Sequence, residues 1–158
     1  MGLIELTMYG MDLTNIHNHN NNQEEIKKII SLSHSEIAIH IEKLTVYGFD
    51  LINLFDSIGN FTSLLELDLG CNFLTDLPKS MENLKNLRKL FLQGNKFQKI
   101  PDVIFELKNL EILDMFYNSE ETNETDIVMP TEKEKINFLE NLALFDIESN
   151  NKSVVITL

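Results

Sequence analysis

Apolar residues recur with a fixed spacing between residues 64 and 109. One set of positions that includes a single Asn and a single Pro is Leu64, Leu67, Leu69, Asn72, Leu74, Leu77, Pro78, Met81 and Leu84. The same set returns 23 residues later as Leu87, Leu90, Leu92, Asn95, Phe97, Ile100, Pro101, Ile104 and Leu107. The Leu-x-Leu step has the period of a strand, whose alternate side chains point to opposite faces. The pattern predicts a strand, a turn and a short helical segment in each copy.

The polar positions of the pattern predict how each turn is made. Asn72 and Asn95 follow the predicted strands, where their amides can bond backbone groups that a tight turn leaves unpaired. Stacked copies would arrange these amides in a ladder. Pro78 and Pro101 fix an extended segment ahead of a short helical or 3₁₀ turn. A single copy cannot bury its apolar side, so the copies are expected to stack around one core.

Three further copies extend the array. Residues 3–16 and 41–54 supply the apolar positions and share the motif Thr-x-Tyr-Gly-x-Asp-Leu. They carry Met11 and Phe49 where the Asn belongs, so we expect their turns to be built differently. A last copy begins at Leu110 and reaches Asn118 before the pattern breaks.

The form L-x-x-L-x-L-x-x-N-x-L at this period resembles the leucine-rich repeat family. The L-P-x-x-I-x-x-L second half is similar to its short-repeat branch, which includes Ras suppressor and erbin-type proteins. The resemblance implies an α/β solenoid with a curved parallel β-sheet on the concave face. Short helical or 3₁₀ turns, and one or two inserted helices, are expected on the convex side.

We expect a single repeat domain over residues 1–158, with repeats starting near 3, 41, 64, 87 and 110. The longer interval after the first repeat indicates a helical insertion at 17–40. Its polar stretch 17–22 is predicted to be a surface loop. Asn22 and Glu25 are spaced as a helix start, and a helix over 23–32 would pack Ile26, Ile29 and Ile30 on the convex side.

Residues 119–158 are predicted to form a degenerate C-terminal cap. The stretch 119–126 carries four acidic residues and is expected to be a solvated loop. Thr131 and Glu134 have capping-box spacing and predict a helix. Leu142 and Leu144 indicate a sixth strand, and 154–158 a further strand or a closing flap.

Charge and composition limit the classes of partner and the cell compartment that we expect. The formal net charge of −12 argues against nucleic acid, which needs a basic footprint. Residues 111–158 concentrate the charge, with 11 acidic and three basic residues. No apolar run approaches 18 residues, so no membrane association is expected. A single cysteine, Cys71, and the lack of a secretory signal favour a cytoplasmic setting, and a monomer is expected.

The residues beside the core leucines should point out from the concave face. Those expected to contact a partner are Tyr9, Lys43, Thr45, Tyr47, Glu66, Asp68, Lys89, Phe91, Gln93, Asp114 and Phe116. Asn72, Asn95 and Asn118 are assigned to the turns instead. Our hypothesis is that Tyr47, Phe91 and Phe116 anchor a protein or peptide while Asp68 and Asp114 read its basic groups. The alternative is that insertions or the tail cover these rings and make them core.

The sequence lacks the motifs of common catalytic sites. His17 and His19 form a pair in a polar stretch, whereas a zinc site needs three or four ligands. Cys71 has no basic neighbour in sequence to lower its pKa. Phosphate-binding and nucleophile-elbow motifs are missing. We therefore expect no enzyme activity, no metal and no cofactor.

The leading interpretation is a non-catalytic protein-interaction module that binds a protein or peptide on its concave β-face. A second is a small acidic inhibitor or immunity-type protein that neutralises a basic enzyme. A third is the targeting segment of a larger enzyme that contains leucine-rich repeats. Salt dependence of binding separates the first two, because attraction between opposite charges weakens with ionic strength.

Overall fold

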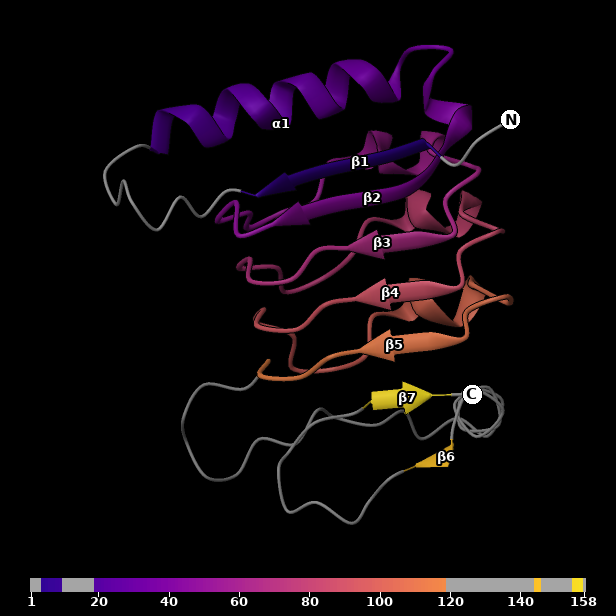
Figure 1. Cartoon of the computed structure of the whole chain (residues 1–158). Coiled ribbons are helices and arrows are strands. Elements are labelled where there is room, and N and C mark those ends of the chain that lie inside the picture. The colour runs from indigo at the N-terminus through magenta and orange to yellow at the C-terminus, as the bar shows by residue number, and fades with distance from the viewer. Residues whose placement is uncertain (1–3, 10–18, 119–143, 146–154, 158) are drawn as a thin grey trace.

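A computed structural model describes residues 4–9, 19–118, 144–145 and 155–157. Five parallel strands lie side by side in chain order (Figure 1). They are β1 (Ile4–Tyr9), β2 (Ile41–Tyr47), β3 (Glu66–Asp68), β4 (Lys89–Phe91) and β5 (Ile112–Asp114). Each of the predicted repeats therefore contributes one strand, and equivalent residues pair, as Leu67 does with Leu90 and Leu90 with Leu113.

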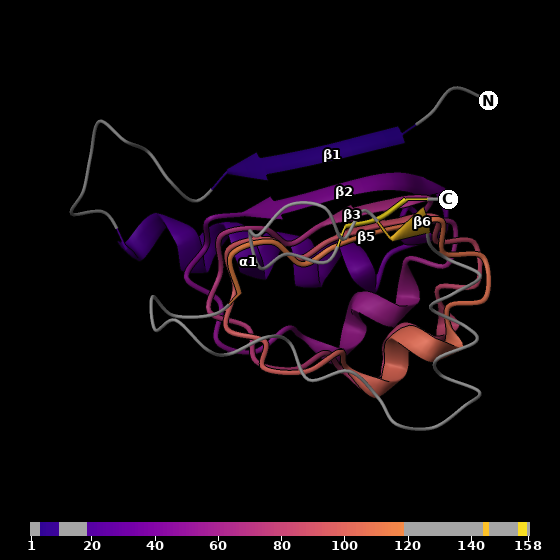
Figure 2. The ribbon, with the colours of Figure 1, turned by 90° about the horizontal axis from the view of Figure 1, so that it is seen from below.

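Short 3₁₀ helices lie on the side of the described repeats opposite the strands (Figure 2). They are η1 (Ala38–His40), η2 (Asp56–Asn60), η3 (Lys79–Asn83) and η4 (Asp102–Glu106). Pro78 and Pro101 stand just before η3 and η4 in an extended conformation, which confirms their predicted role. Phe55 precedes η2 with nearly the same dihedral angles, so the repeat geometry imposes this conformation even without a proline.

The core lies between the sheet and the 3₁₀ layer. Leu67, Leu90 and Leu113 are fully buried at the centres of their strands, and Met81 and Ile104 meet them from the 3₁₀ side with no exposed surface. Burying side chains of this size contributes roughly 1.5–3 kcal/mol each. Because the repeats that begin near residues 41, 64 and 87 each add such a set, the core continues from one repeat to the next.

The insertion after the first repeat contains α1 (His19–Ser33). The helix lies at the end of the stack beside β1, on the side of the sheet that carries the 3₁₀ helices (Figures 1 and 2). Ile29 is fully buried and Ile26 packs partly against the core, as predicted. The predicted loop at 17–22 is wrong for residues 19–22, which are helical, so the helix starts earlier than Asn22. Polar side chains are compatible with the solvent side of a helix, and the apolar spacing that located the helix begins only at Ile26.

The C-terminal end of the sheet differs from a simple sixth repeat. β7 (Val155–Thr157) pairs antiparallel with β5, and β6 (Leu144–Phe145) pairs antiparallel with the outer side of β7. The predicted final strand is thus confirmed, but the predicted sixth strand is not the neighbour of β5. Continuation of the repeat pattern would place Phe145 in one row with Phe116, but the register aligns it with Leu113 through Ile156. The acidic loop and the capping-box helix predicted between 119 and 143 lie outside the described residues.

Candidate functional site: the concave face

The face of the sheet opposite the 3₁₀ helices, called here the concave face, displays three rows of side-chain positions. Strand pairing and repeat position define them as a first row (Glu5, Lys43, Glu66, Lys89, Ile112), a middle row (Thr7, Thr45, Asp68, Phe91, Asp114) and a last row (Tyr9, Tyr47, Gly70, Gln93, Phe116). Strand pairing and repeat position together assign the residues predicted to bind a partner to these three rows. Whether they bind one stays a prediction.

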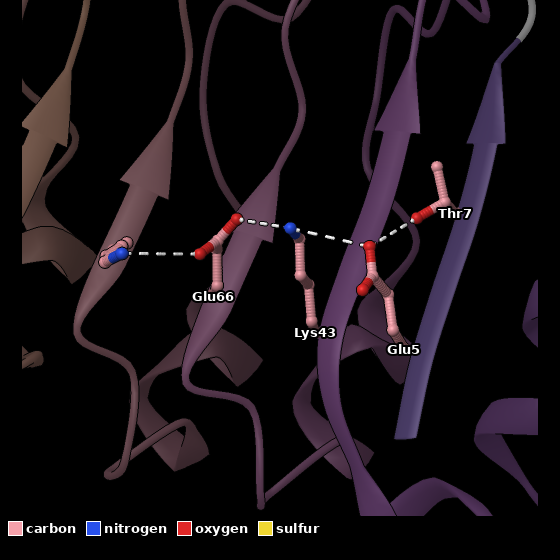
Figure 3. Close-up of polar contacts among 5 residues, drawn as sticks. Glu5, Thr7, Lys43 and Glu66 are labelled. Carbon is pink, nitrogen blue, oxygen red and sulfur yellow. Dashed lines mark hydrogen bonds and ion pairs between the residues drawn. The ribbon is translucent and has the colours of Figure 1, made fainter. Parts of the chain in front are cut away.

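The first row is a ladder of alternating charges (Figure 3). The Lys43 ammonium lies 3.4 Å from the Glu5 carboxylate and 3.1 Å from the Glu66 carboxylate. Glu66 also contacts Lys89 at 3.6 Å. The hydrogen bond to Glu66 raises the pKa of Lys43, and the charge of Glu66 adds to the shift. The ladder therefore compensates its own charges.

The middle row contains the hydrophobic and acidic centre of the face. Phe91 is half-buried and pairs with Asp68 on one side and with Asp114 on the other. Thr45, predicted to contact a partner, is only 5% exposed, because neighbouring groups cover it. It can therefore offer a partner little surface.

Both middle-row aspartates are held by the backbone of their own strand ends. The Gly70 N–H donates to Asp68 Oδ1 at 2.8 Å, and the Phe116 N–H donates to Asp114 Oδ1 at 2.9 Å. Burial raises the pKa of both carboxyls, and at Asp68 the charges of Glu66 and Asp114 raise it further. These backbone bonds, with the Gln93 amide at Asp68, favour the ionised form and oppose the shift.

The last row is shaped by a missing side chain. A Cβ atom at Gly70 would come within 2.4 Å of Gln93 Nε2 and 2.9 Å of Tyr47 Cε2, so glycine lets these two side chains approach each other. Cys71 Sγ and Tyr47 Oη are hydrogen-bonded at 2.7 Å, and this interaction raises the pKa of Tyr47. Cys71 therefore orients an aromatic ring of the face.

Behind the face, three buried asparagines join the repeats. The amides of Asn72, Asn95 and Asn118 each donate to a carbonyl of their own repeat and to one of the preceding repeat. Their Oδ1 atoms accept from N–H groups of the preceding turn, as Asn95 does from Leu74 at 3.0 Å. Asn72 accepts from both Phe49 and Leu51, so the turn that lacks its own asparagine is bonded by the next repeat.

Two further regularities were missed by the sequence reading. A second, exposed ladder runs from Ser63, Asn86 and Asn109 to carbonyls of the preceding repeat. A left-handed backbone also recurs every 23 residues, at Gly48, Cys71, Gly94 and Tyr117. The glycines at two of these positions were a usable signal, because glycine adopts positive φ most readily.

The described residues contain no group of three or more His, Cys, Asp or Glu side chains placed to hold a metal ion. No helix among them is long and apolar enough to cross a membrane. Two hollows of about 440 Å³ lie away from the concave face, one between η3 and η4 and one between α1 and the turn after β2. Neither of these two hollows is lined by a residue of the three rows.

Two proteins of known sequence are similar to parts of this chain. Over 92 residues the chain is 38% identical to the probable serine/threonine-protein kinase pats1 of Dictyostelium discoideum, covering 54% of this chain and 3% of that protein. Over 65 residues it is 37% identical to asporin of Bos taurus, covering 40% of this chain and 18% of asporin. The chain therefore spans a small part of these relatives.

A solved structure and a family model both indicate leucine-rich repeats. The structure of a leucine-rich repeat protein of Leptospira interrogans superposes with a TM-score of 0.50 at 28% identity, covering 73% of this chain and 25% of that one. Residues 62–119 match the leucine-rich repeat family model. With strands, 3₁₀ helices and an asparagine ladder repeating every 23 residues, the chain is a leucine-rich repeat protein.

Proposed function

We propose that this protein is a non-catalytic interaction module that binds a protein or peptide on its concave face. Leucine-rich repeat proteins generally bind protein partners, and solenoids use their concave surfaces to do so. The observation that carries the proposal is the placement of Tyr47, Phe91 and Phe116. All three are half-buried on a face whose other side chains are mostly polar, and they retain surface for a partner.

The arrangement of these rings resembles the centre of a protein interface. Aromatic side chains supply large contact area at low entropic cost, and they are enriched among residues that dominate binding energy. The charge ladder of the first row borders them on one side. Paired charges at the rim of an interface add little affinity, but they help to set the orientation of the partner.

The test is capture of partners from a native lysate by the wild type and by a Tyr47→Ala, Phe91→Ala, Phe116→Ala variant. A matched control, Ile37→Ala, Ile39→Ala, Ile52→Ala, removes three exposed apolar side chains that lie off the concave face. Circular dichroism establishes that both variants fold. We expect a partner to be retained by the wild type and the control and lost by the concave variant.

Two results would contradict this proposal. If the folded concave variant keeps every partner, the aromatic rings are not the anchors. If the partners that the concave variant keeps are released at high salt, binding depends on attraction between opposite charges. An acidic inhibitor then becomes the better interpretation.

A further inference from the structure

The charges of the concave face are compensated unequally. In the first row, Lys43 and Lys89 contact the carboxylates of Glu5 and Glu66. In the middle row, the structure gives neither Asp68 nor Asp114 an ion pair with a Lys or Arg among the described residues. The hydrogen bonds that these two carboxylates receive there come from neutral amides. Among the described residues, the negative charge of the middle row therefore has no ion-pair partner.

The negative charge of the middle row surrounds an aromatic ring. Asp68, Phe91 and Asp114 are direct partners across β3, β4 and β5. Adjacent strands are about 4.8 Å apart, so the two aspartates flank Phe91 with their backbones roughly 10 Å from each other. A cation placed over Phe91 would therefore have one aspartate of the row on each side.

We propose that the middle row Asp68–Phe91–Asp114 binds one arginine side chain of the protein partner; this rests on the proposed function of the concave face. Guanidinium stacks on aromatic rings and has five donors in a rigid fork, so it can stack on Phe91 while it donates to a flanking carboxylate. A lysine ammonium is a compact, strongly hydrated charge, which gains less from a flat ring beside a carboxylate. The glutamates of the first row already contact lysines, so they have less need of a cation from the partner.

Two features of the aspartates favour specific binding of a cation over general attraction to an acidic surface. Both carboxylates are positioned before a ligand arrives, because backbone N–H groups hold their Oδ1 atoms. Pre-organisation lowers the cost of ordering on binding. Partial burial also lowers the dielectric around the carboxylates, which strengthens their attraction to a cation.

The first test is a titration of the ¹⁵N-labelled chain with N-acetyl-arginine amide into the millimolar range, followed by NMR. N-acetyl-citrulline amide, with a neutral group of nearly the same shape, is the matched probe. We expect the Gly70 and Phe116 amides, which bond the two carboxylates, to shift with the arginine probe, and the citrulline probe to bind on the order of tenfold more weakly. Equal binding of both probes, or no shift at these amides, would overturn the assignment.

Variants then locate the site. Asp68→Asn and Asp114→Asn keep an oxygen that can accept the backbone N–H while removing the charge, and each should weaken the arginine probe about tenfold. Glu106→Gln removes the same charge from an exposed position on η4 and should leave binding unchanged. A loss of affinity that is equal in all three variants would mean general attraction to an acidic protein, and would also refute the site.

The captured partner separates this inference from the proposed function. If capture is lost in the aromatic variant and also in the Asp68→Asn, Asp114→Asn double variant, both proposals are supported. If only the aromatic variant loses the partner, the interaction module stands and the arginine site is wrong. If both variants keep it, both proposals fall.

Discussion

Replacing Asn95 with alanine should destabilise the protein strongly. Asn95 is 2% exposed, and its Nδ2 atom donates to the carbonyls of Leu69 at 2.9 Å and Leu92 at 3.0 Å. Its Oδ1 atom accepts the Leu74 N–H at 3.0 Å. Alanine removes all of these bonds from the middle of the ladder.

The magnitude follows from which groups are left without a partner. The Leu69 carbonyl keeps the Asn72 amide and the Leu92 carbonyl keeps the Asn118 amide, so each loses one bond worth about 1 kcal/mol. The buried Leu74 N–H loses its side-chain acceptor, at a cost of about 1–3 kcal/mol. The sum is about 3–5 kcal/mol, a large part of the roughly 5–15 kcal/mol that stabilises a typical domain.

Urea unfolding followed by circular dichroism measures this loss. Asn109→Ala is the matched control, because Asn109 also bonds the preceding repeat through its amide but is exposed to water. Water can replace that bond, so the control should cost less than about 1.5 kcal/mol. Equal losses in the two variants, or a loss below about 1 kcal/mol for Asn95→Ala, would refute the argument that burial makes the ladder important.

Three further predictions concern charge and packing. The raised pKa values of Asp68 and Asp114 mean that ionisation opposes folding, so stability should fall as pH rises above their ordinary value of 3.8. Asp68→Asn should therefore raise the melting temperature at pH 7, with the gain vanishing near pH 3, and a gain independent of pH would contradict this. Gly59→Ala should cost about 1–3 kcal/mol in urea unfolding, since its Cβ would lie 2.4 Å from the Ser80 carbonyl oxygen; a neutral result would show that η2 and η3 can separate. Lys43→Met should change stability by less than about 1 kcal/mol, and less still at high salt, because the ladder is partly exposed; a larger loss in thermal melts would disprove this.

The local parts of the fold were predictable because they repeat. Leucine spacing predicted the strands of β1 to β5, and Pro78 and Pro101 predicted the extended segments before η3 and η4. The concave rows followed from the alternation of side chains in a strand. The start of α1 was missed, because residues before Ile26 have no apolar spacing to reveal a helix.

The candidate site was predictable in its membership but not in its energetics. Sequence position placed Asp68, Phe91 and Asp114 in one row. It could not show that Lys43 and Lys89 bond Glu5 and Glu66, because those contacts depend on how long side chains lie across strands. Nor could it show that Thr45 is covered.

The sequence by itself determined that this protein is a stack of 23-residue units with an apolar core, because a unit that cannot bury its leucines alone must share them with a neighbour. Only the tertiary structure decided how the stack ends and how its face is charged. β7 inserts between β5 and β6 in the opposite direction, which no repeat spacing encodes. Pairing between strands distant in sequence compensates the first row and leaves Asp68 and Asp114 without a cation among the described residues, since only contacts across repeats determine which charges meet.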